Sequence, residues 1–392
     1  MSESAGAPVS VAPALRAALS GVIDPELHRD VLSLGMISSA TLQDGYARVE
    51  LLLTIPGCPA ARLLEERTRS ACETVTGPGR TQVHTSVMTD AQRRALVEKI
   101  RGRRARTPFG PGSRTRVIAV ASGKGGVGKS TLTANLACTA AAAGERVGLI
   151  DADVYGYSIP GMLGISASPT KVGELLMPPS AHGVAAVSIG MFVPDNRPVS
   201  WRGPLLARTL EQFLGDVHFG PLDVLFLDLP PGTGDMALTL GQLLPNAEVL
   251  VVTSPQPAAS TVAVRAGLLA QKLGQRIVGV VENMSWVETP GGPFPVFGTG
   301  GGTRTAEALS AETGTAVPLL GQVPLTLPLR ESADAGRPVS EEAPDDPAAR
   351  ALGELWRALA ARKPARARIP RGGAGRGGAA STGPAPERPA GR

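Results

Sequence analysis

The sequence predicts an α/β protein in which a doubly wound, mostly parallel β-sheet domain follows a small α+β domain. Two observations carry this prediction. From residue 117 onward, continuous apolar runs are separated by helical stretches, which is typical of a parallel sheet covered by helices on both faces. Before residue 101 the strand-like runs alternate apolar and polar residues, which is typical of a sheet with one exposed face.

The front unit is predicted to contain short helices and strands. Its expected elements are a helix at 11–20, strands at 36–42 and 46–54, a helix at 59–75, a strand at 82–88 and a helix ending near 101. The DGY sequence at 44–46 suits a hairpin between the first two strands. We therefore expect a small α+β domain over residues 1–100. Arg mixed with Pro and Gly then predicts a linker over residues 101–116.

The longer unit is predicted to form the parallel sheet. Its strands are expected at 117–122, 146–153, 223–230, 248–255 and 276–284, with an Ala-rich helix at 131–144. Ligands of such sheets bind at the carboxyl ends of the strands, so the polar residues that end each strand are the candidate site. We expect this domain to span residues 117–361.

The charge of the chain is unevenly distributed. The whole sequence carries a net charge of +5, and residues 362–392 alone carry +7, which leaves about −2 for residues 1–361. The basic character therefore belongs to a Gly-, Pro- and Arg-rich tail, which we expect to be disordered and solvated. A nucleic-acid-binding core is not implied, so no specific nucleic-acid partner is expected.

The expected compartment follows from features that the sequence lacks. No apolar run reaches the length of a membrane helix, and the first residues do not read as a signal peptide. We therefore expect a cytoplasmic protein with no membrane partner. The three cysteines, Cys58, Cys72 and Cys138, form neither a CxxC pair nor a zinc pattern.

One loop carries a phosphate-binding motif. Residues 123–130 fit G-x-x-x-x-G-K-[ST] in full, after a predicted strand and before a predicted helix. The loop residues are Gly123, Lys124, Gly125, Gly126, Val127, Gly128, Lys129 and Ser130. Its glycines let backbone N–H groups turn toward phosphate oxygens. We expect Lys129 to neutralise the β- and γ-phosphates of ATP and the Ser130 hydroxyl to bind Mg²⁺.

Carboxylates follow two of the predicted strands. Asp228 ends one apolar run, where a carboxylate would hold the Mg²⁺ shell. Asp151 and Asp153 follow another strand, so one is expected near the Mg²⁺ shell and the other near the attacking water. The Gly/Pro loop 229–235 is suited to sensing a γ-phosphate. With Lys124 and Lys129, these residues predict a Mg²⁺-dependent ATPase.

Lys124, a second lysine near the start of the loop, points to one group of P-loop proteins. The ordered motifs are GKGGVGKS, DADVYGYSIPGMLG at 151–164, WRGP at 201–204, DLPPGTGD at 228–235, ENMS at 282–285 and LGQVPL at 320–325. Over residues 115–345 this set resembles the Mrp/ApbC iron–sulfur cluster carrier ATPases, relatives of MinD, ParA and the nitrogenase iron protein. The resemblance implies ATP-dependent delivery of clusters to apoproteins by a homodimer. It also implies that Lys124 reaches the partner subunit's nucleotide and that the Asn283 amide reads the adenine edge.

The front unit resembles the SufT-like assembly domain often fused ahead of Mrp. The resemblance rests on Asp24-Pro25-Glu26-Leu27, Leu34-Gly35 and the run 54–59 around Cys58. It implies that Cys58 is a reactive or iron–sulfur-associated thiol. The residue follows a Pro-Gly turn and precedes a predicted helix, so we expect an exposed cysteine with a stabilised thiolate.

The sequence departs from the carrier pattern at one place. Carriers of this kind generally have a CxxC pair after ENMS, but residues 285–294 contain no cysteine. Because cysteine thiolates are the usual cluster ligands, two alternatives stay open. One is an adaptor or chaperone ATPase that holds no cluster. The other is a MinD- or ParA-like positioning ATPase, although residues 369–392 are too poor in apolar residues for a membrane-binding helix.

Overall fold

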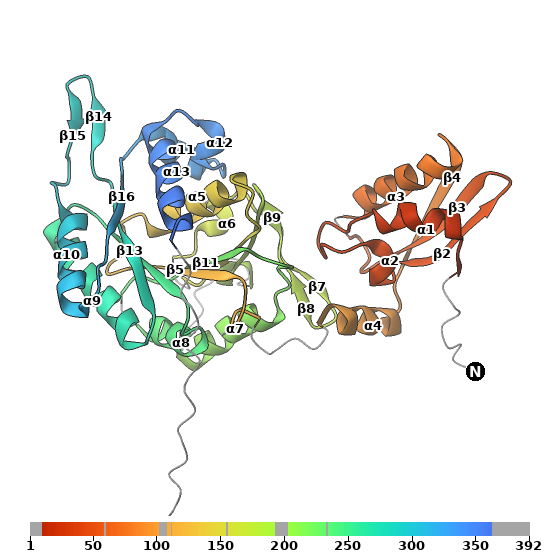
Figure 1. The fold of residues 1–392 in the computed structure, drawn as a ribbon, viewed down its shortest axis with the longest axis horizontal. Coiled ribbons are helices and arrows are strands. Elements are labelled where there is room, and N and C mark those ends of the chain that lie inside the picture. Colours follow the sequence, from red (N-terminus) through yellow and green to blue (C-terminus); the bar gives the residue numbers. More distant parts are fainter. Residues whose placement is uncertain are drawn as a thin grey trace, which may run out of the picture.

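The computed structural model describes residues 10–58, 60–101, 108–110, 112–153, 156–192, 203–232 and 234–362 (Figure 1). The predicted tail from residue 363 onward, residues 102–107 and 111 of the predicted linker, and residues 59, 154–155, 201–202 and 233 of the quoted motifs lie outside these ranges. In the described ranges the chain forms a smaller front domain and a larger P-loop domain.

The front domain is a sheet packed against helices. Its elements are β1 (Ser10–Val11), α1 (Pro13–Ser20), α2 (Val31–Leu34), β2 (Ile37–Gln43), β3 (Tyr46–Leu53), α3 (Ala61–Thr76), β4 (Thr81–Val87) and α4 (Asp90–Arg101). The described strands are ordered β1-β2-β3-β4. β2 and β3 form the predicted antiparallel hairpin, and its two turn residues, Asp44 and Gly45, have φ of 50° and 78°. The expected helices and strands of this domain are therefore present, within a few residues at their ends.

The P-loop domain is built on a large sheet. Its described strands run in the order β16-β13-β12-β5-β11-β6-β10-β9, with every pair parallel except β10 and β9. Their bounds are β5 (Arg116–Ser122), β6 (Val147–Asp151), β9 (Ser180–Ala181), β10 (Val184–Ser188), β11 (Val224–Asp228), β12 (Glu248–Thr253), β13 (Arg276–Asn283) and β16 (Leu319–Val323). The five predicted strands are all present. β10 and β16 were not predicted, because their short runs are diluted by alanine, glycine and glutamine.

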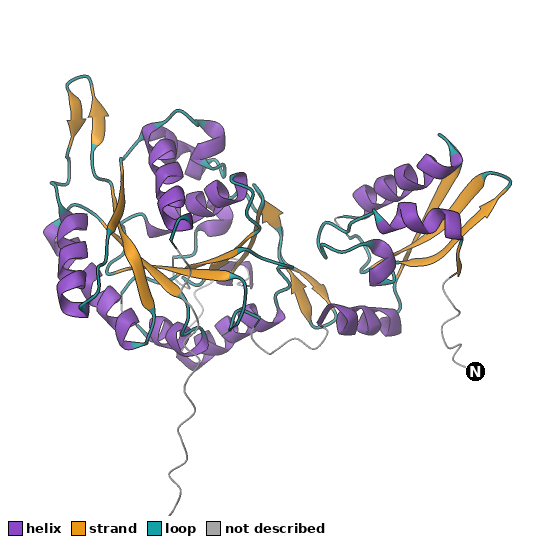
Figure 2. Ribbon diagram, in the orientation of Figure 1, coloured by secondary structure: helices purple, strands orange, loops and turns teal. Residues whose placement is uncertain are grey.

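Helices cover both faces of this sheet (Figure 2). One apolar core contains residues of α5 (Lys129–Ala142), α6 (Ile159–Met162), α11 (Leu327–Asp334), α12 (Val339–Glu342) and α13 (Pro347–Ala360). The opposite core contains residues of α7 (Gly203–Asp216), α8 (Asp235–Leu243), α9 (Pro257–Lys272) and α10 (Gly301–Thr313). The fold is therefore the expected doubly wound α/β domain. In the described part of the chain, no helix combines the length and apolarity that crossing a membrane requires.

Three small features complete the domain. They are η1 (Ile189–Phe192), the hairpin of β7 (Thr170–Val172) and β8 (Leu175–Met177), and the hairpin of β14 (Val287–Thr289) and β15 (Gly292–Phe294). The β7–β8 hairpin supplies Val172 and Leu175 to the apolar core of the front domain, where Leu96 and Val97 of α4 are also buried. The two domains are therefore in direct apolar contact at α4 (Figure 1).

Candidate nucleotide site

The phosphate-binding loop lies between the end of β5 and the start of α5. Gly126 and Gly128 have φ of 79° and 76°, a backbone conformation that favours glycine. α5 begins at Lys129, so its N-terminal N–H groups face the loop. A cavity of about 770 Å³ opens here. Among the residues that line it are 124–131, Asp153, Pro230, Pro231, Gly232, Gly234, Met236 and Ala237. This volume is in the range of small-molecule binding sites.

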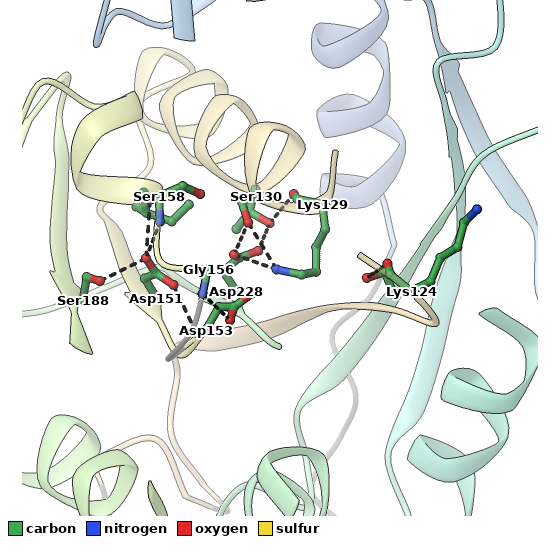
Figure 3. Close-up of polar contacts among 12 residues, drawn as sticks. Lys124, Lys129, Ser130, Asp151, Asp153, Gly156, Ser158, Ser188 and Asp228 are labelled. Carbon is green, nitrogen blue, oxygen red and sulfur yellow. Dashed lines mark hydrogen bonds and ion pairs between the residues drawn. The ribbon is translucent and has the colours of Figure 1, made fainter. Parts of the chain in front are cut away.

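Asp228 joins the loop to the neighbouring strand β11. Its Oδ2 atom accepts hydrogen bonds from Lys129 Nζ at 2.7 Å and from Ser130 Oγ at 2.6 Å (Figure 3). The carboxylate is fully buried, and Lys129 is 6% exposed. Because β11 pairs directly with β5, the end of β11 lies beside the loop. Lys129, Ser130 and Asp228 are therefore together, as the sequence predicts.

Thr133 is a site residue that the sequence reasoning missed. Its hydroxyl lies 2.7 Å from Asp228 Oδ1 and 2.8 Å from the carbonyl oxygen of Lys129. The residue sits one helical turn after Lys129, so its spacing from the motif was a usable signal. Thr133 orients the carboxylate from the side opposite to Ser130.

Asp151 and Asp153 occupy different environments beyond Asp228. Asp151 is fully buried and accepts a hydrogen bond from Ser188 Oγ at 3.0 Å, while Asp153 accepts one from the Gly156 backbone at 3.0 Å. Burial, followed by the charge of Asp228, raises the pKa of Asp151 to about 7. Asp153 lines the cavity. Figure 3 shows both carboxylates on the same side of the loop as Asp228.

Lys124 points away from this cluster. Its Nζ atom donates a hydrogen bond to Gln256 Oε1 at 3.0 Å, whereas Lys129 points toward Asp228 (Figure 3). Gln256 precedes α9, after the end of β12. The two lysines of the loop therefore contact different parts of the domain: Lys129 contacts Asp228, and Lys124 contacts Gln256.

Asn283, the last residue of β13, contacts the phosphate-binding loop. Its Nδ2 atom donates to the carbonyl oxygen of Val127 at 2.9 Å, and a Cβ placed on Gly128 would lie 2.2 Å from that same nitrogen. The side chain, which is 3% exposed, therefore supports the loop and requires glycine at position 128. The predicted adenine contact of Asn283 stays a prediction.

Cys58 does not have the environment that the sequence led us to expect. It is 7% exposed and belongs to the apolar core of the front domain. Burial, followed by the charge of nearby Glu26, raises the pKa of its thiol above the usual range. The expectation of an exposed, thiolate-favouring cysteine is wrong, because α3 begins at Ala61, and Cys58 and Ala60 pack into the core. Cys72 and Cys138 are also buried.

Two family models match the chain. The model described as NUBPL iron-transfer P-loop NTPase matches residues 113–360, and the model described as iron–sulfur cluster assembly protein matches residues 13–85. These matches agree with the two resemblances drawn from the motifs.

Curated proteins and a solved structure are similar to this chain. An iron–sulfur cluster carrier protein of Mycobacterium tuberculosis is 50% identical over 89% of this chain and 93% of its own length. One of the same name from Deinococcus radiodurans is 42% identical over 88% of this chain and 94% of its own length. A nucleotide-binding protein from Archaeoglobus fulgidus, solved in complex with ADP, is 35% identical with a TM-score of 0.50, covering 59% of this chain and 89% of that one. Together with the geometry of the loop, these findings show that the chain belongs to the NUBPL iron-transfer P-loop NTPase family.

Proposed function

We propose that this chain is a Mg²⁺-dependent ATPase that carries iron–sulfur clusters and delivers them to apoproteins. The ATPase part of the proposal is supported by the buried contact of Lys129 and Ser130 with Asp228, because Lys129 and Ser130 also line the cavity of about 770 Å³. The proposal that the chain carries clusters is supported by its similarity, over most of its length, to proteins named iron–sulfur cluster carriers.

The oxygen donors of the site fit a magnesium ion. Ser130 Oγ and Asp228 Oδ2 lie 2.6 Å apart, and Mg²⁺ prefers oxygen ligands. When bound, the ion would neutralise charge on the phosphates. We propose that Ser130 and Asp228 hold it, with Asp151 supporting indirectly. Lys129 then leaves Asp228 and turns to the β- and γ-phosphates, so one ammonium serves both arrangements.

Asp153 is the proposed residue for orienting the attacking water. It lines the cavity beside residues of the loop, and its Oδ1 atom is held by the Gly156 backbone at 3.0 Å. Asp151 is the less suitable base, because it is fully buried and is held by Ser188 and by the backbone N–H groups of Ser158 and Ile159. We therefore assign Asp151 to shaping the loop after β6.

We propose a homodimer that forms in the presence of ATP, in which Lys124 reaches the partner subunit's nucleotide. The support is that Lys124 points away from Lys129 and Asp228 (Figure 3). With Mg²⁺ and a slowly hydrolysed ATP analogue, light scattering should show association that weakens at least tenfold in Lys124→Ala. Lys171→Ala, an exposed lysine on β7, is the matched control and should associate as the wild type does. A wild-type chain that stays monomeric with every nucleotide contradicts the proposal.

An iron–sulfur cluster requires several protein ligands. Among the described residues, no group of three or more His, Cys, Asp or Glu side chains is arranged to hold a metal ion. One thiolate cannot hold a cluster, so Cys58 would need a second copy, a partner protein or a thiol cofactor to complete the ligand set. Because Cys58 is buried, its participation also requires the front domain to open. An adaptor ATPase that binds no cluster is the second candidate, favoured by the missing CxxC pair.

Anaerobic reconstitution distinguishes the two candidates. The wild type, Cys58→Ser and the control Cys72→Ser are incubated with iron and sulfide, and bound iron, bound sulfide and visible absorbance are measured per dimer. A carrier retains both elements and shows sulfide-to-iron charge-transfer bands. Loss of the bands in Cys58→Ser alone assigns Cys58 as a ligand, and equal bands in all three exclude it. Absence of any cluster from the wild type supports the adaptor and contradicts the carrier.

A further inference from the structure

The hydrogen bond between Lys124 and Gln256 joins two segments that are held together by backbone packing. A Cβ placed on Gly123 would lie 2.1 Å from the carbonyl carbon of Val262 in α9, so the start of the loop lies directly against that helix. Only glycine allows this approach. Lys124, the next residue, is therefore placed beside the beginning of α9 by the main chain.

Gln256 is also fixed at its backbone. It is the extended residue before Pro257, the first residue of α9. The preceding carbonyl, that of Pro255, accepts a hydrogen bond from Arg304 Nη2 at 2.8 Å. A Cβ on Gly301 would lie 2.2 Å from the Ser254 carbonyl oxygen, so α10 packs tightly on the same segment. The side chain of Gln256 thus projects from a rigid base toward Lys124.

We infer that Gln256 is a positioning residue that holds Lys124 within its own subunit and releases it when the dimer forms. This inference rests on the proposed function, because it concerns the lysine that we assign to the partner subunit's nucleotide. Lys124 cannot reach a partner while its ammonium remains on Gln256. The strength of this contact therefore sets part of the free energy of dimerisation.

The chemistry of the acceptor explains why release is easy. An ammonium group only donates hydrogen bonds, so the Gln256 amide must present its oxygen to Lys124. An amide oxygen is a neutral acceptor, and it holds an ammonium less strongly than a carboxylate, which would add an ion pair. Gln256 and Lys124 are both half-buried, so a carboxylate at position 256 would be only partly screened by water. Glutamine at this position thus places the lysine while keeping the free-energy cost of releasing it low.

The test compares two substitutions at position 256, of which only Gln256→Glu should weaken the dimer. Gln256→Glu has nearly the same shape and should raise the dimer Kd at least tenfold in low salt, because two lysines are released per dimer. Gln256→Ala removes the acceptor and should dimerise at least as tightly as the wild type. Sedimentation with Mg²⁺ and a slowly hydrolysed ATP analogue measures both. The matched control is Gln271→Glu, an exposed position in the last turn of α9 that adds the same charge.

Two further measurements separate this role from a structural one. The defect of Gln256→Glu should shrink in high salt, and it should vanish in the Lys124→Ala background, because no ammonium is left to hold. A purely structural role predicts that Gln256→Ala and Gln256→Glu weaken the dimer alike, with no dependence on Lys124, and that result overturns the inference. Equal Kd values for Gln256→Glu and the wild type also overturn it. If the wild type does not dimerise, the proposed dimer fails, and the inference with it.

Discussion

Lys129→Ala is expected to reduce ATP hydrolysis more than a hundredfold. The ammonium of Lys129 is the proposed partner of the β- and γ-phosphates, and losing one well-placed charge in a buried site costs several kcal/mol of transition-state stabilisation. Phosphate release by the purified variant, measured with saturating ATP and Mg²⁺, gives the effect. The control is Lys272→Ala, an exposed lysine in the last turn of α9, which should hydrolyse ATP at the wild-type rate.

The same substitution should also destabilise the nucleotide-free protein. Lys129 is 2.7 Å from Asp228, and both groups are buried, so its removal leaves a buried carboxylate without its charge partner. Breaking such a pair costs about 3–5 kcal/mol. Lys129→Arg, which keeps the charge, tests whether lost activity follows from lost folding. A folded Lys129→Ala protein with wild-type turnover would show that the nucleotide site lies elsewhere.

Glu248→Ala is expected to destabilise the P-loop domain by about 3–5 kcal/mol. The Glu248 side chain is 1% exposed and forms ion pairs with Arg116 at 2.6 Å and with Arg276 at 3.6 Å. Arg116 also donates to the Leu359 carbonyl oxygen at 2.6 Å, which attaches α13 to the start of β5. Losing the carboxylate therefore leaves buried charge unpaired where three elements meet.

Thermal unfolding measures this effect. For a domain of this size, a loss of about 3–5 kcal/mol corresponds to a decrease in Tm of roughly 6–20 °C. Glu307→Ala, an exposed glutamate on α10, is the control and should change Tm by no more than about 2 °C. Glu248 is the first residue of β12, whereas the phosphate-binding loop follows the other, carboxyl end of the parallel strands. ATP affinity of the folded variant should therefore be retained. An unchanged Tm would mean that the ion pairs contribute no net stability.

The grouping of the loop residues with the carboxylates could be predicted from the sequence, because its determinants are local. The loop motif, the apolar runs and the carboxylates that end them are each read from a few consecutive residues. Parallel pairing of β5, β6 and β11 then places Lys129, Asp228 and Asp151 together without further information. The family resemblance, which rests on the same local motifs, is confirmed by the matching family model.

Ser188 and Gln256 could not be predicted, because their roles depend on contacts between distant segments. Ser188 reaches Asp151 only because β10 pairs with β6, and β10 was not predicted. The proposed role of Gln256 depends on its hydrogen bond with Lys124, which lies 132 residues earlier in the chain. The prediction that Cys58 is exposed was wrong because it, too, ignored contacts with distant segments. Its turn sequence favours exposure locally, but the packing of the front domain core buries it.

The β7–β8 hairpin has a consequence for the synthesis of the protein. The front domain core includes Val172 and Leu175, yet its own last helix, α4, ends at Arg101. At about 5–20 residues per second, a ribosome needs roughly 4–15 s to make the 76 residues that follow Arg101, as far as Met177 (177 − 101 = 76). During this interval Leu96 and Val97 lack their hairpin partner, so the nascent front domain presents an apolar surface. A fragment cut at the linker would keep that surface permanently, and aggregation of such a fragment would be relieved by restoring the hairpin rather than by extending the linker.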